Sequence, residues 1–447
     1  MTSAPVPASV AALRSDHQAG QSLVLGMVLM GAAIVALIHF FQLGQVVAAR
    51  SKQTHALDAA AYSGALVQAR ALNLLALINR TQVGHQVAMA HLVTLASWAS
   101  FGATEALQFA RGNPPAYLIG MLFGPEHGAA YASAALAAGM DALARDDGAL
   151  AQAFLAHDAL VQGSLRVAGR QVADSVVDAR RAMMEAVLEA SYAGAPAFFT
   201  PGDGGAPALH IEEDGWPSYL QTHAGLSLRP FVLQAAAHYG FLKPRNHTQR
   251  NPWVVDARCP SRRHELRRRG ATELDAQGLW QSIDTQSHHA LRSNRWIGCY
   301  FREYAMGWGW VPTQAQARLA EPHVAQPPEN FAQQDFWRWV QEHTDWNIAS
   351  GSGNPMANSH AVAAGVRWQG GGLPPYLDTR QGGPDAVGFV AILKRTGPQS
   401  LRIRTRSAAQ AFFDRPEPRP DGRIETANLF RHYWQARLSA DLLPAED

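Results

Sequence analysis

Histidines are the side chains in this sequence most able to bind a metal ion or transfer a proton near neutral pH, and the chain has eighteen of them. None stands in a His-x3-His pair with a further ligand close by. His264-Glu265 begins a pattern typical of zinc proteases, but Arg268 occupies the position of the second histidine. Nucleophile-elbow and phosphate-loop patterns are absent as well. We therefore expect no catalytic residues, no metal site, no cofactor and no enzyme activity.

A concentration of positive charge is the second feature that could do chemistry. Its members lie between positions 258 and 269: Arg258, Arg262, Arg263, His264, Arg267, Arg268 and Arg269. The run fits a solvated face, or contact with an anionic partner such as phospholipid headgroups or an acidic surface polymer. The residues expected to make that contact are Arg262, Arg263, Arg267, Arg268 and Arg269. Nucleic acid is not expected, because Trp253 and Trp280 do not interleave with the cations in a base-stacking pattern.

The two cysteines, Cys259 and Cys299, both fall in the C-terminal half of the chain. If that half is exported, an oxidising compartment favours a disulfide between them, which would close a loop of about 40 residues. A pair of unrelated buried thiols is the alternative.

These residues must be positioned by elements that begin with an apolar run from Ser22 to Phe41, in which His39 is the only strongly polar side chain. About 20 apolar residues at about 1.5 Å each span a hydrocarbon core of about 30 Å, so we expect a transmembrane helix at 21–45 after a disordered tail at 1–20. A cleaved secretory signal and the core helix of a soluble protein are the alternatives. No other apolar run in the chain reaches 18 residues.

Helix-forming residues continue beyond the expected span. Between Ala59 and Thr104 the only charged side chains are Arg70 and Arg80, so most of this helix must be covered by other protein. Gly84 and Gly102 are expected places for a bend, and the prolines at 114 and 115 end the helix. A flat face suited to close helix packing is predicted at Asp58, Ala61, Gly64 and Ala65.

A second helical region is expected at 126–195, with breaks at Gly139, Gly148 and Gly163. Its last part has an apolar stripe formed by Val172, Val176, Ala179, Met183 and Ala186. Packed against the charge-poor segment 59–104, this stripe would form an antiparallel hairpin, so 46–195 is predicted to be a helical rod and hairpin.

The composition changes at the linker 196–207, and residues 208–447 are predicted to form a mixed α+β domain. A helix is expected at 331–342. The expected strands are Trp253–Ala257, Arg295–Phe301, Trp308–Val311, Val387–Leu393 and Leu401–Thr405. With 38 basic and 36 acidic residues, the whole-molecule charge favours no polyanionic partner.

Two short motifs flank the apolar run. Residues 19–25 read Ala-Gly-Gln-Ser-Leu-Val-Leu and residues 58–65 read Asp-Ala-Ala-Ala-Tyr-Ser-Gly-Ala. Together they resemble the N-terminal module of tight-adherence (Tad/Flp) pilus-assembly proteins of the TadE/TadG-like kind, over about a ninth of the chain. The chain departs from the family pattern at Ala19, where the family has arginine, and at Leu25, where pilin-like members have glutamate. The metal-binding Asp-x-Ser-x-Ser run of von Willebrand A-type domains, which some relatives carry, is absent.

The resemblance implies a structural component of a pilus or secretion assembly in the bacterial inner membrane. It would have a single span, a cytoplasmic N-terminus and a periplasmic or extracellular bulk, with processing at Gly20-Gln21. Its expected partners are the lipid bilayer, other membrane or pilus-assembly proteins and further copies of the chain. Flanking charge opposes this orientation mildly, since Arg14 precedes the span and Arg50 and Lys52 follow it. A membrane-tethered periplasmic enzyme or ligand-binding protein is the alternative function.

Overall fold

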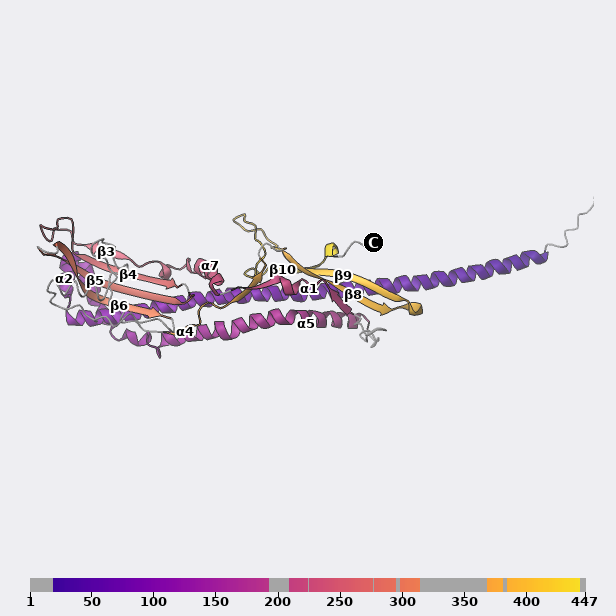
Figure 1. Cartoon of the computed structure of the whole chain (residues 1–447), viewed down its shortest axis with the longest axis horizontal. Coiled ribbons are helices and arrows are strands. Elements are labelled where there is room, and N and C mark those ends of the chain that lie inside the picture. Colours follow the sequence, from indigo (N-terminus) through magenta and orange to yellow (C-terminus); the bar gives the residue numbers. More distant parts are fainter. Residues whose placement is uncertain are drawn as a thin grey trace, which may run out of the picture.

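The computed structural model describes residues 19–192, 209–223, 225–275, 277–294, 298–313, 368–380 and 384–442. Most of the expected N-terminal tail, the expected linker and the helix expected at 331–342 lie outside these residues. What is described combines helices and antiparallel sheets around one very long helix (Figure 1).

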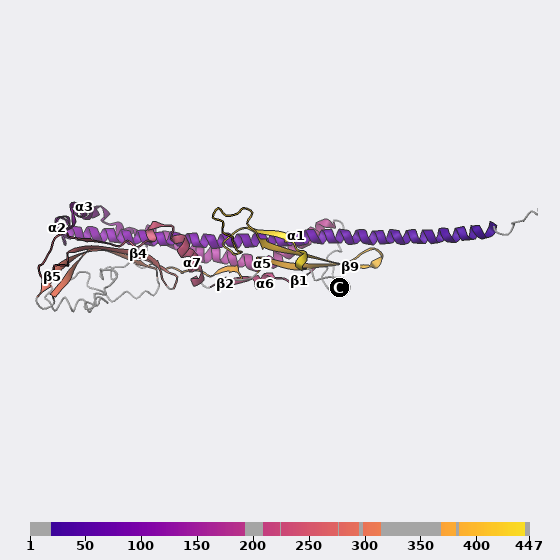
Figure 2. The same ribbon diagram turned by 90° about the horizontal axis from the view of Figure 1, so that it is seen from above.

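That helix, α1 (Ala19–Arg111), runs for 93 residues without interruption, which corresponds to about 140 Å at the usual rise. It ends where predicted, at Gly112 with φ +65° and the prolines that follow. Gly84 and Gly102 remain helical, so neither ends the rod. The N-terminal part of α1 projects alone from the rest of the molecule in both views (Figures 1 and 2).

The second helical region folds back along α1, as the amphipathic pattern predicts. Its elements are α2 (Ala116–Phe123), α3 (Pro125–Ser133), η1 (Ala134–Ala137), η2 (Met140–Leu143), α4 (Ala149–Ala159), η3 (Leu160–Leu165) and α5 (Arg166–Ser191). Gly139, with φ +79°, and Gly148 stand between elements as expected. Gly163 instead lies in η3, a π-helical turn that joins α4 to α5 without a break.

The strands form two four-stranded antiparallel sheets and one two-stranded ribbon. The proximal sheet, nearer the free end of α1, has the order β1 (Leu209–Glu212), β8 (Ala386–Thr396), β9 (Arg402–Phe413), β10 (Trp434–Leu438). The distal sheet has the order β3 (His247–Arg250), β4 (Glu265–Leu274), β5 (Trp280–Asn294), β6 (Gly298–Pro312). The ribbon pairs β2 (Leu220–His223) with β7 (Tyr376–Thr379).

Short helices connect the strands. They are α6 (Trp216–Tyr219), α7 (Gly225–Ala236), η5 (Gly240–Leu242) and η6 (Pro398–Ser400), and a last turn, η7 (Ala440–Leu442), follows β10.

Both sheets take their hydrophobic cores from α1. Near the proximal sheet, Leu57 and Ala61 of α1 pack with Leu188 of α5 and with Phe389 of β8. Farther along, Met89 and Val93 pack with Trp280 of β5, Val311 of β6 and Phe154 of α4. The helical rod and the C-terminal strands therefore share their cores, and the charge-poor part of α1 is covered by this chain's own helices and sheets.

Most of the predicted strands are confirmed in full or in part, and one is wrong. The strand predicted at 387–393 is confirmed within β8, and the strand predicted at 401–405 is confirmed within β9 except for Leu401. The strand predicted at 308–311 lies in β6, which also contains the described part of the strand predicted at 295–301. The strand at 253–257 is wrong. Those residues form a loop, because Asn251 and the cysteine at 259 tie the backbone to its neighbours instead of to a strand.

The buried stripe of α5 also differs from the predicted one. Val176 is buried as expected, but Ala179, Met183 and Ala186 are exposed. The inward positions after Val176 are Arg180, Met184 and Leu188, one every four residues. Because a cation, Arg180, stands at the centre of this stripe, the spacing of apolar residues alone does not reveal it.

Candidate functional site

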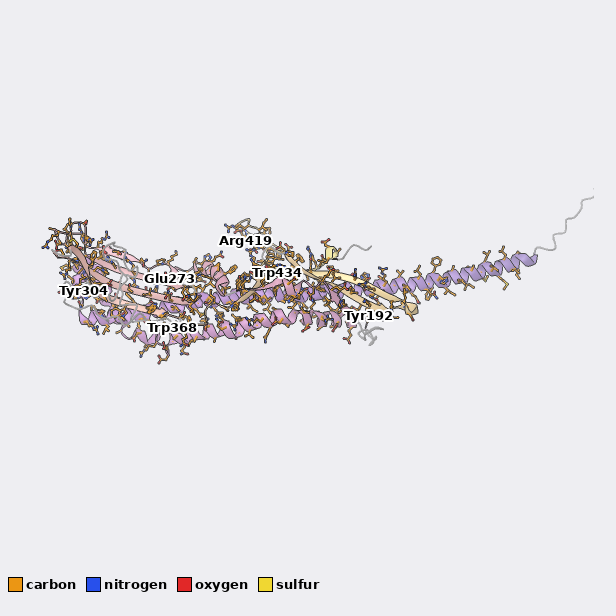
Figure 3. All side chains as sticks on the ribbon, viewed as in Figure 1. Tyr192, Glu273, Tyr304, Trp368, Arg419 and Trp434 are labelled. Carbon is orange, nitrogen blue, oxygen red and sulfur yellow. A yellow bond between two sulfur atoms is a disulfide. The ribbon has the colours of Figure 1, made fainter. Side chains whose placement is uncertain are left out.

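The projecting part of α1 is the first candidate. From Leu23 to Leu43 its large apolar side chains are exposed, with Leu29 at 60% and Phe40 at 71%, and this part of the helix projects beyond the sheets (Figure 3). The helix is long and apolar enough, by length and composition, to cross a membrane. An exposed apolar surface of this size marks a site of contact with a membrane or with another protein. Gly20 and Gln21, the expected processing site, lie in the first turn of this helix.

The predicted packing face lies just beyond this segment and is occupied from within the chain. Ala61 and Ala65 are fully buried. A Cβ on Gly64 would lie 2.9 Å from Sδ of Met184 and 3.0 Å from Cγ of Arg180, both on α5. The Asp58 carboxylate accepts a hydrogen bond of 2.6 Å from the Ser407 hydroxyl on β9. The close helix packing predicted for this face is made within the chain, by α5, and the proximal sheet covers the face beside it.

Arg180 is the centre of this contact. Its guanidinium is fully buried, pairs with both carboxylate oxygens of Asp214, and lies 4.4 Å from the ring centre of Phe389 on β8. Removing either partner of such a buried pair would leave the other charge buried without compensation, which is strongly destabilising. The signal that would have found Arg180 is the strict four-residue spacing from Val176 to Leu188.

Buried and half-buried amides along α1 form hydrogen bonds with groups in the C-terminal half. The amides are Gln53, Asn73, Asn79 and Gln86. Asn73 both donates to and accepts from the backbone of Trp434, at 2.9 and 3.0 Å, where β10 begins (Trp434 is labelled in Figure 3). Because each amide binds a fixed point more than 190 residues away, together they set the rotation and position of α1 against the strands.

The distal sheet approaches α1 through a buried aspartate. Asp284 of β5 accepts two hydrogen bonds of 2.8 Å from Arg245 and one of 2.9 Å from the Ser97 hydroxyl of α1. On β6, a Cβ at Gly309 would lie 2.2 Å from the Ser97 carbonyl oxygen, so only glycine permits this approach of strand and helix. The charge is paired and hydrogen-bonded, as buried charges must be.

The arginine run is divided by the fold. On β4, Arg267 pairs with Glu265 at 2.7 Å, Arg268 stacks 4.3 Å over Phe101 of α1, and Arg269 donates to the His247 carbonyl. These three are engaged within the distal sheet or with α1 and remain half-exposed, so the anionic contact expected of them stays a prediction. Arg262 and Arg263 lie before β4 on a loop at the far end of the molecule.

That loop carries the first cysteine. Cys259 is joined to Cys299 at the start of β6, with 6.0 Å between their Cα atoms. The Arg262 guanidinium donates to the Cys299 carbonyl at 2.8 Å. The bridge thus holds the exposed part of the arginine run to the β5–β6 hairpin.

Titratable groups in the distal sheet are shifted by burial. Burial raises the pKa of Glu303 to about 8, opposed by the Ser287 hydrogen bond and by Arg267. Burial raises the pKa of Glu105 to about 7, with Arg268 opposing. His288, packed against Tyr304 and Phe123, has a pKa lowered to about 3, chiefly by burial. All of these groups are enclosed by the fold. Within the described ranges no three His, Cys, Asp or Glu residues are grouped to hold a metal ion.

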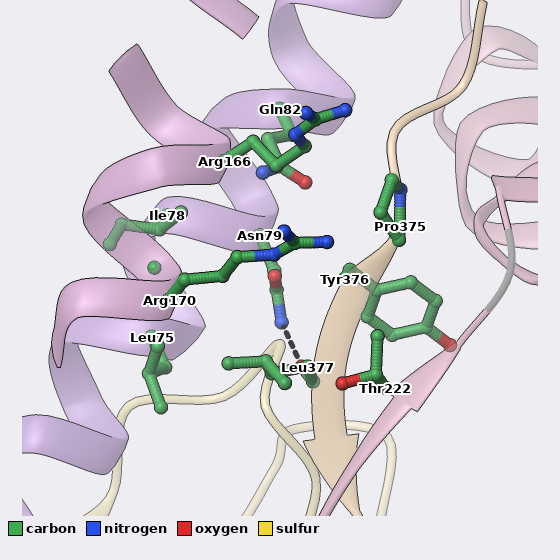
Figure 4. Close-up of a pocket in the computed structure, with 11 residues that line it drawn as sticks. Leu75, Ile78, Asn79, Gln82, Arg166, Arg170, Thr222, Pro375, Tyr376 and Leu377 are labelled. Atoms are coloured by element: carbon green, nitrogen blue, oxygen red, sulfur yellow. Dashed lines mark hydrogen bonds between the residues drawn. The ribbon is translucent and has the colours of Figure 1, made fainter. Parts of the chain in front are cut away.

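A small cleft lies between α1, α5 and β7 (Figure 4). Its cavity volume is about 20 Å³, room for about one water molecule and far below the several hundred Å³ of typical ligand sites. Arg170 extends from α5 towards the strand that carries Tyr376, and the Asn79 amide at its wall donates to the Leu377 carbonyl at 2.8 Å. Its lining residues include two arginines but no carboxylate, cysteine or histidine, so the cleft offers charge for a small anion without an acid–base pair.

Comparison with protein-family models, with curated proteins and with solved structures finds no match to this chain.

Proposed function

We propose that this chain is a membrane-anchored structural component of a bacterial cell-envelope assembly of the tight-adherence pilus or secretion type. One observation carries the proposal. A single uninterrupted helix has bare apolar side chains over its first part and is covered by two sheets and a second helix over the rest. Such an element joins a bilayer to a folded body without a hinge.

The disulfide supports an exported body. Bridges of this kind persist in oxidising compartments and are rare in the cytosol, so Cys259 and Cys299 favour a periplasmic or extracellular location for the sheets. Arg50 and Lys52, which follow the span, favour the opposite orientation. We give the disulfide more weight, because the charge difference amounts to one residue.

The identity of the assembly rests on the resemblance at 19–25 and 58–65. Leu25 stands where pilin-like members carry a glutamate, and Ala61 and Gly64 are covered by the chain's own α5. Both features favour an anchored accessory component over a fibre-forming subunit.

A second candidate is a tethered ligand-binding protein or enzyme. The observation that favours it is the cleft lined by Arg166 and Arg170, which places two cations around a space of about 20 Å³. If this is the function, Arg170→Glu should abolish its biological activity while leaving membrane assembly intact.

The test of the main proposal is crosslinking in native membranes followed by mass spectrometry, with an alkaline-phosphatase fusion at residue 447 to report sidedness. We expect an active fusion and crosslinks to other envelope or pilus-assembly proteins. An inactive fusion would refute the orientation. An active fusion with crosslinks only within the chain would refute the structural role.

A further inference from the structure

The loop between β3 and β4, residues 251–264, is called the distal loop. Its ends are fastened to each other: the Asn251 side chain accepts from the His264 backbone N–H at 2.8 Å, and the Asn251 N–H donates to the His264 carbonyl at 3.2 Å. The same side chain donates to the Trp253 carbonyl at 2.9 Å. Asn251 is almost fully buried, so it fixes the base of the loop.

The middle of the distal loop is fastened to the β5–β6 hairpin. Cys259 forms the disulfide with Cys299. Nearby, the Asp256 carboxylate accepts from the Ser293 hydroxyl of β5 and, at 2.9 Å, from the Arg258 backbone N–H. A loop held at its base and its middle is preorganised, so it loses little conformational freedom when a partner binds.

The distal loop, fixed in this way, exposes apolar and cationic side chains to solvent. Trp253 is 46% exposed and Val254 is 51% exposed, one after the other along the chain. Arg258 of the loop and Arg292 of β5 are exposed, and neither has a carboxylate at ion-pair distance in the described part of the chain. The loop contains three arginines against one aspartate, Asp256, which is already hydrogen-bonded.

The distal loop lies at the end of the molecule opposite the membrane segment. β4 begins at Glu265, paired with His289 near the end of β5, and both views place this end of the distal sheet farthest from the free part of α1 (Figures 1 and 2). From Gln45 to Arg111 the helix rises about 100 Å. The loop therefore cannot reach the bilayer that holds its own anchor while α1 stands upright.

We propose that the distal loop binds the anionic headgroups of a second membrane surface, facing the one that holds α1. Tryptophan is enriched at the membrane–water interface, and arginines beside it are attracted by the negative surface potential of anionic lipid. An acidic polysaccharide fits less well, because it would pair with the arginines and stack on Trp253 but leave Val254 in water. The inference rests on the proposed anchoring of α1.

The test is vesicle capture with the full-length chain. The protein is reconstituted in phosphatidylcholine vesicles, which are immobilised and offered labelled acceptor vesicles of phosphatidylcholine alone or mixed with phosphatidylglycerol. We expect capture of the phosphatidylglycerol vesicles only, decreasing as salt is raised. Arg258→Gln should weaken capture about fivefold, as expected for one cation near an anionic surface, and Trp253→Ser should weaken it as well. Arg423→Gln, an exposed arginine on another loop, is the matched control and should leave capture unchanged.

Three results would overturn the proposal. Protein that stays in the donor vesicles after an alkaline carbonate wash but captures no anionic acceptor would refute the distal loop as a lipid site. Equal capture of neutral and anionic vesicles would refute the role of the arginines, and binding of dextran sulfate without vesicle capture would assign the loop to a polysaccharide. Loss of the protein in the carbonate wash would instead contradict the anchor, and with it the bridge between membranes.

Discussion

At the residue scale, the tightest contacts are made where glycine or a buried charge stands. Gly64 lets α5 approach α1, Gly309 lets β6 approach α1, and Arg180 and Asp284 sit beside these contacts with their charges paired. The close-packed interior of a protein tolerates neither added side-chain volume nor an unpaired charge. The same contacts that exclude other proteins from this face make it sensitive to substitution.

Gly64→Leu should therefore destabilise the fold. A Cβ alone would meet Met184 and Arg180 at about 3 Å, so the larger side chain should cost on the order of 1–3 kcal/mol through overpacking. Gly84→Leu is the matched control: it lies in the same helix with nothing within 4 Å of its Cβ position, and should be neutral or slightly stabilising because leucine favours helix more than glycine does. Thermal unfolding in detergent measures both. Equal melting temperatures for the two variants would show that α5 does not pack on Gly64.

Glu303 should make stability fall as pH rises. Its pKa is about 8 in the folded chain against an ordinary value near 4.5, so between these values the folded state keeps a proton that the unfolded state releases. At pH 6.5 a histidine with a lowered pKa, such as His288, is neutral in the folded state and about half protonated in the unfolded state. These histidines therefore oppose the trend at the lower end of the range, and the comparison with Glu303→Gln isolates the contribution of the glutamate.

From pH 6.5 to 8, Glu303 should contribute a loss of about 1–2 kcal/mol in the free energy of unfolding, and Glu303→Gln should remove that loss. Denaturant unfolding in detergent at several pH values measures it. Glu189→Gln, at an exposed position on α5, serves as control. Two results would contradict a buried, protonated Glu303. One is that Glu303→Gln leaves the pH dependence of the free energy of unfolding unchanged; the other is that stability rises with pH and the substitution abolishes the rise.

At the element scale, α1 acts as a template for the strands. Its buried amides hydrogen-bond groups of the C-terminal half at successive points, so the proximal sheet, the ribbon and the distal sheet are each fixed to it. A helix with only apolar side chains could rotate or slide with little penalty, whereas these hydrogen bonds are lost together if α1 shifts. These hydrogen bonds therefore resist rotation and sliding of α1 against the strands.

Asn79→Leu tests this template. The Asn79 amide donates to the carbonyls of Leu377 and Leu429, both at 2.8 Å, and its loss should leave two acceptors without this donor at a cost of about 1–3 kcal/mol. Thr81→Ala, whose hydroxyl bonds only its own helix at Leu77, is the control. Amide hydrogen exchange should increase in β2 and β7 in the first variant alone. Unchanged exchange in both variants would mean that the amide does not hold the ribbon.

Sequence reasoning reached the elements with strong periodicity and missed those without it. The α1 rod, its end before the prolines and its hairpin with α5 follow from apolar spacing and charge depletion. β8 follows from a short apolar run between turns, and β9 follows from alternation. β4 and β5 were missed because their inward side chains include Glu265, Asp284 and His288, which resemble a solvated segment until their partners are known. Burial of Arg180 was missed for the same reason, because Asp214 lies 34 residues away.

At the scale of the whole molecule, the chain is an elongated body built on one helix, with an apolar segment at one end and the braced distal loop at the other (Figure 1). No described element folds back to cover the apolar segment. Since α1 has no interruption between the two ends, the position of the membrane segment fixes the position of everything else. We therefore expect the protein to hold its distal sheet about 100 Å from the bilayer.

Neutron reflectometry on a supported bilayer containing the full-length chain measures this distance directly. We expect a protein layer that extends about 100 Å from the lipid surface, with its density continuing to that limit. The result holds whichever leaflet the body faces, so it tests the anchored rod independently of orientation. A layer only a few tens of ångströms thick, as for a body lying flat on the lipid, or a bilayer from which buffer removes the protein, would contradict an upright, membrane-anchored rod.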